Sequence, residues 1–451
     1  MHLNVFTQCS PSPQFAGLWR HPSDGTSTGY RSLEHWTAIA RRLEAACVDA
    51  LFFADSHGPF DVYRGSWAPA VRDAVQIPSI DPVLVLPAMA AVTRNLGFAV
   101  TYSTTYHAPY ECARVFSSLD HLTQGRIAWN IVTSFLASAY ENGLGDKLEH
   151  DDRYDRADEY MSIVRALWEE SWEEGAVVLD RERNMFTDPE KVHAIHHAGE
   201  YFRVRGPHQC EPSPQRTPVL YQAGASHRGM DFAARHAEVV FVTLPDAKSG
   251  ARQVAELRQR VAQIGRAPES MKILQGSLVV VGSTLQEAKN KARLIGELIS
   301  PEGEFAKWCG WSGFDFAAYP DDAPVAEIPT QASQSVLRLL HQVNRERNWT
   351  VADLRSFVSL GWRPHRRNAL IGDPSEVVNQ MEEWISLAGV DGFNLLPCPS
   401  SGIDDICDLL VPELQRRKLF RASYDPAERT LRERYFGANN RSCRAPGFKP
   451  A

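Results

Sequence analysis

The chain has 451 residues, of which 43% are hydrophobic and 23% charged, and its formal net charge is −7. This is the composition of an ordinary globular protein, without the polar bias of disordered chains. No long run of Lys and Arg is present, which argues against nucleic acid or an anionic membrane surface as a partner. The first ten residues lack a signal-peptide pattern, and no window reaches the roughly 18 apolar residues of a membrane span. We therefore expect a cytoplasmic protein that acts on a small molecule.

Short apolar runs alternate with helical patterns along the chain, which is typical of βα units around a parallel sheet. The expected helices cover residues 33–46, 153–172, 250–264 and 285–299. Eight runs are expected to be strands: 3–7, 50–54, 96–101, 127–132, 219–222, 239–242, 273–281 and 393–396. Eight is the strand number of a TIM barrel, so the predicted fold is an α/β (β/α)8 barrel that spans residues 1–451 as one domain. Two stretches, about 171–218 and 300–372, exceed a minimal barrel and are expected to be insertions.

Polar residues follow the expected strands at the end where TIM-barrel active sites are built. Asp55 follows the second run, and the third leads into Thr101 and Ser103. The fourth run carries Asn130 and ends near Ser134. These residues are expected to point into one barrel mouth. The alternative is that Asp55 and Ser134 merely cap the helices that follow them.

The fifth run is followed by a Gly turn, Ser226 and a helical pattern, a combination that favours an anion because backbone N–H groups and the helix dipole point at it. Ser226 is therefore a candidate phosphate ligand, with an ordinary helix N-cap as the alternative. His150 and Tyr154 are four residues apart, so they share a face if both are helical. A metal site is not expected, because neither this cluster nor the eight scattered cysteines has suitable ligand spacing.

Four motifs resemble those of one enzyme family, the bacterial-luciferase-like flavin monooxygenases. They are SSLDHLTQGR at 117–126, WNIVTS at 129–134, EHDDRY at 149–154 and YQAGAS at 221–226. The similarity runs over almost the whole chain and is greatest to the group of nitrilotriacetate monooxygenase component A, dibenzothiophene-sulfone monooxygenase and long-chain alkane monooxygenase. It implies a TIM barrel with insertions that binds reduced FMN.

The resemblance also implies roles for individual residues. Seven positions are expected to bind FMN, namely Asp55, Thr101, Ser103, Asn130, His150, Tyr154 and Ser226. The alkane branch of the family has a Cys and several His residues in its substrate pocket, and the matching positions here are Ser10, Pro13, Phe135 and Lys307. Flavin chemistry is therefore expected to persist, whereas specificity for alkanes does not follow from the resemblance. No catalytic residue is assigned.

The implied function is the oxygenase half of a two-component monooxygenase. A separate NAD(P)H-dependent reductase would supply FMNH2, which reacts with O2 to give a flavin C4a-hydroperoxide that oxidises an alkane, a sulfur heterocycle or a halogenated aromatic. The alternatives are a deazaflavin (F420)-dependent oxidoreductase on the same barrel and a catalytically silent flavin-binding protein. Family members are commonly homo-oligomers, and the same is expected here.

An aromatic-rich stretch within the second insertion is a candidate lid. Six residues could form an apolar cover that shields the reacting flavin from water: Phe305, Trp308, Trp311, Phe314, Phe316 and Tyr319. The alternative is a structural excursion at the periphery of the barrel.

Overall fold

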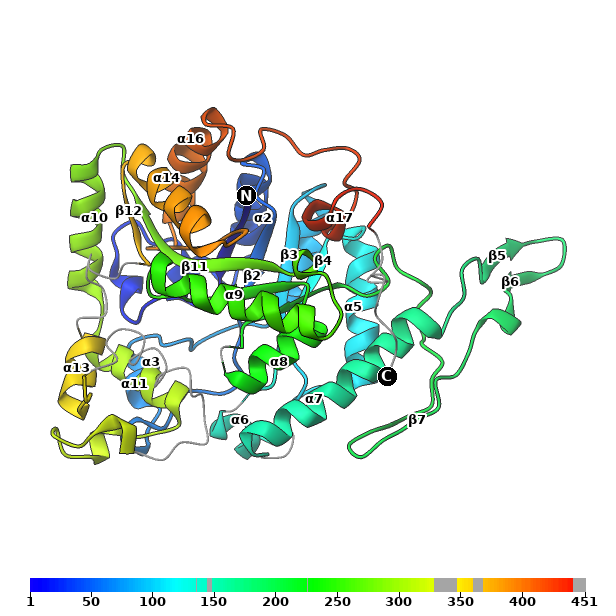
Figure 1. Ribbon diagram of the computed structural model, residues 1–451, viewed down its shortest axis with the longest axis horizontal. Helices are drawn as coiled ribbons and strands as arrows, with labels where there is room; N and C mark the ends of the chain where they lie inside the picture. The colour runs from blue at the N-terminus through cyan, green and yellow to red at the C-terminus, as the bar shows by residue number, and fades with distance from the viewer. Residues whose placement is uncertain (135, 144–147, 225, 328–346, 360–367, 441–451) are drawn as a thin grey trace.

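The computed structural model describes residues 1–134, 136–143, 148–224, 226–327, 347–359 and 368–440. Within these ranges eight parallel strands close into a barrel, since β10 pairs with both β9 and β11, and β13 pairs with both β11 and β1 (Figure 1). The barrel strands are β1 (His2–Thr7), β2 (Ala50–Phe53), β3 (Gly97–Ser103), β4 (Ile127–Val132), β9 (Val219–Gln222), β10 (Val239–Val242), β11 (Lys272–Val281) and β13 (Gly392–Pro397). The predicted α/β TIM-barrel fold is confirmed.

The barrel strands are buried on both faces, which is why each appears in the sequence as a short apolar run. Side chains alternate between the two faces. In β2, Phe52 packs inside the barrel with Ala99 and Tyr221, whereas Phe53 belongs to the layer between strands and helices. Thr101 lies two residues after Ala99 on β3 and is paired in register with Asn130 on β4, so both side chains face the interior.

Helices form the outer layer and pack their apolar faces on the strands (Figure 1). The longer ones are α2 (Leu33–Ala45), α5 (Pro109–Thr123), α7 (His150–Arg165), α8 (His227–His236), α9 (Ala247–Gln263), α10 (Leu285–Leu298), α11 (Pro301–Ser312), α13 (Val351–Ser359) and α14 (Pro374–Glu383). The shorter ones are α1 (Thr26–Gly29), α3 (Ala68–Arg72), α4 (Leu86–Ala91), α6 (Ala137–Glu141), α15 (Gly402–Asp405), α16 (Val411–Arg416) and α17 (Leu431–Phe436). In the described ranges no helix is both long and apolar enough to cross a membrane.

The boundaries differ from the expected ones at several elements. The long helix α7 begins at His150 rather than at residue 153, and after Arg165 it continues only as a π-helical turn, Ala166–Glu170. Strand β3 runs to Ser103, two residues beyond its expected end. A ninth strand, β12 (Leu370–Gly372), was not expected and pairs with the C-terminal end of β11. Three residues are too short a run to be distinguished from a loop by periodicity.

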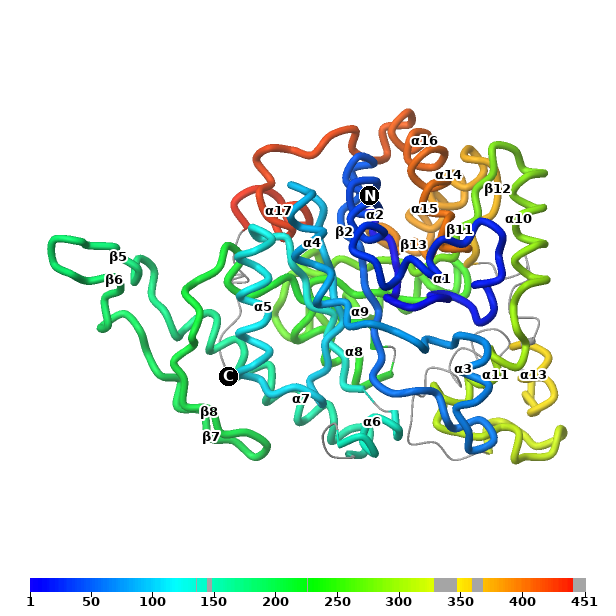
Figure 2. The backbone as a smooth tube through the Cα atoms, turned by 180° about the vertical axis from the view of Figure 1, so that it is seen from behind, coloured from blue at the N-terminus to red at the C-terminus, as the bar shows by residue number. Residues whose placement is uncertain are grey.

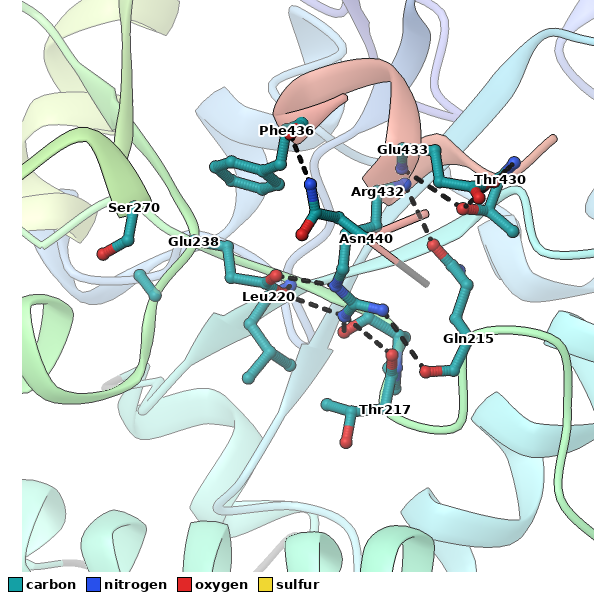
Figure 3. Close-up of polar contacts among 12 residues, drawn as sticks. Gln215, Thr217, Leu220, Glu238, Ser270, Thr430, Arg432, Glu433, Phe436 and Asn440 are labelled. Carbon is teal, nitrogen blue, oxygen red and sulfur yellow. Dashed lines mark hydrogen bonds and ion pairs between the residues drawn. The ribbon is translucent and has the colours of Figure 1, made fainter. Parts of the chain in front are cut away.

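Helix α17 closes the N-terminal end of the barrel, opposite to α6 and α11 (Figures 1 and 2). Leu431 and Tyr435 belong to the cluster inside the barrel. Arg432 is 2% exposed and binds Glu238 through Nε, at 2.7 Å, and donates from Nη2 to the carbonyl oxygen of Thr217 at 2.8 Å (Figure 3). Because this end is filled by side chains, a ligand site must lie at the other end.

The two long stretches between barrel elements have different structures. The first forms two hairpins, β5 (Val177–Asp180) with β6 (Met185–Thr187) and β7 (His197–Ala198) with β8 (Arg203–Val204), which extend away from the barrel (Figure 2). In the second, α11 and α13 pack together in a small separate core. This core lies at the same end of the barrel as α6 (Figure 1).

Candidate active site

A cavity of about 360 Å³ lies at the C-terminal ends of the barrel strands. Its wall comes from the segments after β1, β2, β4 and β9, from the start of α7 and from α11. Four of the seven residues expected to bind FMN line it: Asp55, His150, Tyr154 and Ser226. The fold thus brings together residues that lie on three separate segments of the chain.

The other three expected residues lie on the strands that lead to the cavity and do not line it. Asn130 is buried and donates from Nδ2 to Thr101 Oγ1 at 2.8 Å, and that hydroxyl donates to the Phe53 carbonyl at 2.8 Å. Ser103 accepts a hydrogen bond from Ser134, a cavity residue, at 2.9 Å between the two oxygens. These three side chains therefore support the cavity floor. Asp55 and Ser134 are not the N-cap residues of the described helices, so the capping alternative fails for them.

The start of α8 forms one end of the cavity. Ser226 is the N-cap of this helix, because its Oγ accepts from the Gly229 N–H at 2.9 Å. A hydroxyl that accepts in this way still has its own proton to donate, so the capping role is compatible with binding an anion. Gly229 is required for close packing, since a Cβ there would lie 2.8 Å from the Tyr154 hydroxyl oxygen. Burial raises the pKa of Tyr154, so this hydroxyl remains a neutral donor at pH 7.

Helix α7 adds further polar groups beside Ser226. The rings of His150 and Tyr154 lie 5.4 Å apart, as expected for two residues on one helical face. Arg153 also lines the cavity and was not among the expected residues. Its Nη1 donates to the Leu148 carbonyl at 3.0 Å, while its Nε is buried without a hydrogen-bond partner among the described residues. Its position three residues after His150 was the one sequence signal that could have identified it.

The segment after β2 contributes two titratable side chains. Burial and the nearby Asp81 raise the pKa of Asp55 to about 7, and burial lowers the pKa of His57. Asp55 Oδ2 and His57 Nδ1 lie 3.9 Å apart, and both residues line the cavity. At neutral pH Asp55 is therefore divided between its protonated and ionised forms beside a neutral imidazole. Such a group can take up or release a proton without a large cost in free energy.

Of the positions expected in the substrate pocket, Ser10, Pro13 and Lys307 do not line this cavity. Ser10 is 1% exposed and lies outside the lining. Lys307 is 4% exposed, and its Nζ forms an ion pair with Glu304 Oε1 at 2.7 Å. Phe135 lies outside the described residues, and Pro13 is buried but also away from the lining. Much of the cavity wall is instead built from residues that were not assigned a role from the sequence.

These residues include Phe6, Gln8, Phe60, Gln76, Leu136 and Gln222. Of the aromatic stretch expected to form a lid, Trp311 alone is among the described lining residues. Phe305, Trp308 and Phe316 are buried in the core that α11 shares with α13, and Phe314 and Tyr319 pack against that core. The structural alternative thus holds for most of this stretch, and Trp311 is the exception.

The residues of this cavity fit FMN. Ser226, Tyr154, Arg153 and the first N–H groups of α8 form an end suited to a phosphate. The side-chain oxygens of Gln8 and Gln222, which also line the cavity, are buried without a hydrogen-bond partner in the described chain. Unsatisfied acceptors of this kind suit the N–H and O–H donors of an isoalloxazine ring and a ribityl chain.

Comparisons with known proteins identify the family. The model of luciferase-like monooxygenases matches residues 15–392. Long-chain alkane monooxygenase from Geobacillus thermodenitrificans is 44% identical and is aligned over 98% of this chain and 95% of its own length. Dimethyl-sulfide monooxygenase from Hyphomicrobium sulfonivorans is 43% identical over 97% of this chain and 90% of its own length. The chain belongs to the luciferase-like monooxygenases.

Solved structures agree with this result. A crystal structure of long-chain alkane monooxygenase has a TM-score of 0.90 at 44% identity, with 98% of this chain and 96% of the other covered. A riboflavin lyase crystallised with modified FMN and riboflavin has a TM-score of 0.91 at 34% identity, with 99% and 98% covered. The resemblance inferred from the four sequence motifs is confirmed, and the protein is a monooxygenase.

Proposed function

We propose that this protein is the oxygenase component of a two-component monooxygenase that uses reduced FMN and O2. The observation that carries the proposal is the cavity itself, which has anion-binding groups at the α8 end and apolar side chains at the other. A separate NAD(P)H-dependent reductase supplies FMNH2. The reaction consumes FMNH2, O2 and substrate and yields FMN, water and the oxygenated product, so electrons and atoms balance.

Bound reduced FMN would supply the two electrons that activate O2. The protein would position the flavin and the substrate, hold or release a proton, and keep water out of the cavity. Ser226, Tyr154 and Arg153 would hold the phosphate, and Gln222 would face the ring system. Asp55 and His57 would take up or release a proton at Oδ2 and Nδ1 from the cavity wall. Phe60 and Trp311 would exclude water, which would otherwise divert reduced oxygen to hydrogen peroxide.

The substrate is an apolar or weakly polar organic molecule. In the described lining, the basic residues other than His57 are Arg153 and His150, and both belong to the phosphate end. A polycarboxylate would need a second group of Arg or Lys side chains to neutralise it. Nitrilotriacetate monooxygenase component A, a relative that is 38% identical, is therefore a less suitable guide to the substrate than the alkane and dimethyl-sulfide enzymes.

The experiment is a substrate panel assayed with FMN, NADH and a flavin reductase. It includes n-alkanes, dialkyl sulfides, sulfur heterocycles and halogenated aromatics, and it records oxygen uptake and product. The reductase alone with FMN gives the background. Product formation that depends on both this protein and O2 supports the proposal. Turnover without O2 and with reduced F420 would identify the deazaflavin alternative instead, and flavin binding without any turnover would identify a silent binding protein.

A further inference from the structure

Helix α11 lies against the apolar end of the cavity. The phosphate end is built on β9 and α7. Phe6 belongs to β1, and Asp55 and Phe60 come from the segment after β2. Strands β4 and β3 separate β2 and β1 from β9 in the barrel. Phe60 and Leu136 share a small apolar cluster against which Trp311 of α11 packs. The apolar end of the cavity therefore has a wall made by Phe60, Leu136 and Trp311.

Gly310 determines how far Phe60 can recede from the cavity. A Cβ at Gly310 would lie 2.1 Å from Phe60 Cδ1 and 2.9 Å from its Cγ. Carbon atoms in contact lie about 3.5 to 4.0 Å apart, so any larger residue would displace the ring by roughly 1.5 Å. Ala70 and Val75 pack in the same cluster as Phe60, so the cavity is the open side toward which the ring would move.

A buried ion pair fixes the other part of this wall. The Lys307 ammonium lies 5.3 Å from the ring centre of Trp311, one helical turn away on the same face, and 5.2 Å from that of Phe15. Its charge is neutralised by Glu304, whose Oε1 also accepts from the Ala16 N–H at 2.8 Å. The pair thus joins α11 to the N-terminal loop and holds Trp311 against the cavity, while its charge is kept away from the substrate.

We propose that Gly310 and Trp311 are specificity-determining residues that set the length and width of the substrate end, and that Lys307 and Glu304 are the positioning residues behind Trp311. The occupant is an uncharged apolar chain or ring that lies against the wall formed by Phe60, Leu136 and Trp311. This inference rests on the proposed function for the oxidation of the occupant. The limit that Gly310 and Trp311 set on the occupant's size concerns binding alone.

The test uses n-alkyl methyl sulfides, from methyl to octyl, as a molecular ruler. Binding to the protein without flavin is measured by depletion of the sulfide from the headspace, and turnover is measured with FMN, NADH and a flavin reductase. Each buried methylene contributes about fourfold in affinity. Gly310→Ala is expected to shorten the tightest-binding chain by at least one carbon and to weaken the longest bound sulfide about fourfold or more. Helix propensity favours Ala, so loss of folding is not expected from this change.

Phe60→Leu in the Gly310→Ala background supplies the compensating change, because a smaller side chain removes the collision. We expect it to restore the longer sulfides. Cys309→Ala is the matched control, because Cys309 is the neighbouring residue but faces the core shared with α13. This variant should leave the dependence of binding on chain length unchanged. If Gly310→Ala leaves the tightest-binding chain length unchanged, or if Phe60→Leu does not restore a chain length that Gly310→Ala has shortened, the steric inference is overturned.

The positioning residues are tested by Lys307→Met combined with Glu304→Gln, which removes both charges and keeps an acceptor for Ala16. We expect FMNH2 affinity to stay within about twofold, while the fraction of oxygen released as peroxide rises and the chain-length optimum broadens. An unaltered optimum and peroxide fraction in the folded variant would overturn this role. If the wild type oxidises no sulfide, the proposed function fails for this class of substrate, and the headspace measurement still decides the inference.

Discussion

Replacement of Ser226 by Ala removes two interactions of one hydroxyl. The first is the N-cap of α8, in which Ser226 Oγ accepts from the Gly229 N–H at 2.9 Å. Loss of such a cap costs about 1 kcal/mol of stability. The second is the proposed hydrogen bond to the FMN phosphate. A hydrogen bond to a charged group is worth about 1.5 to 3 kcal/mol, so FMNH2 affinity should fall roughly 10 to 150-fold.

Three comparisons separate the two losses. Ser226→Asp retains the cap but places a carboxylate against the phosphate, so it should be as stable as wild type and bind FMNH2 more weakly than Ser226→Ala. Riboflavin has no phosphate, and its affinity should not change in Ser226→Ala. Thr284→Ala removes the equivalent cap of α10, where Thr284 accepts from the Glu287 N–H, and should lower stability without affecting FMNH2.

The assay is anaerobic titration with photoreduced FMN and riboflavin, with thermal unfolding measured in parallel. Wild-type FMNH2 affinity in both Ser226 variants would refute the phosphate assignment. Equal losses for FMNH2 and reduced riboflavin would also refute it, because the effect would then come from a general disturbance of the cavity.

Three further predictions concern other parts of the molecule. The raised pKa of Asp55, about 7 against 3.8, means that the folded state keeps a proton that the unfolded state releases, so this group's contribution to stability falls as pH rises from about 4 to 7. The melting temperature of Asp55→Asn minus that of wild type should therefore increase over this range, and a constant difference would contradict the assignment. Arg432→Met should destabilise the fold by about 3 to 5 kcal/mol, because it leaves the buried carboxylate of Glu238 without its ion-pair partner. FMNH2 affinity, at the opposite end of the barrel, should stay unchanged. Chemical denaturation measures the first effect and titration with FMNH2 the second. Trp311→Ala should raise the peroxide released per FMNH2 consumed, whereas Phe314→Ala should not, because Trp311 alone of the two lines the cavity.

The barrel could be predicted because its strands are local features of the sequence. Parallel strands buried on both faces leave continuous apolar runs, and the run at β9, for example, has the bounds expected from the sequence. Strand β12 was missed because it has three residues and depends on pairing with the end of β11. A sequence pattern predicts an element well when the element's own residues, rather than its pairing with a distant segment, produce the pattern.

The site was predictable only in part, for the same reason. Asp55 and Ser226 lie in the short segments that follow strands, so their place at the mouth follows from the fold class. The contact of Gly310 with Phe60 joins residues 250 positions apart in the chain, and no periodicity reports it. Lys307 was expected in the pocket because of its alignment with pocket residues of relatives, but its ion pair with Glu304 places it behind Trp311. Long-range packing decides such positions.

In the proposed function, this chain oxygenates a substrate with reduced FMN that another enzyme supplies. The most direct measurement gives the purified protein photoreduced FMN and 18O2, with dimethyl sulfide or an n-alkane and without NADH or reductase, and follows the label by mass spectrometry. We expect one 18O atom in each product molecule and, in a parallel incubation of the protein with FMN and NADH, no oxidation of NADH. Direct reduction of flavin by NADH on this chain, or a product whose oxygen comes from water, would contradict it.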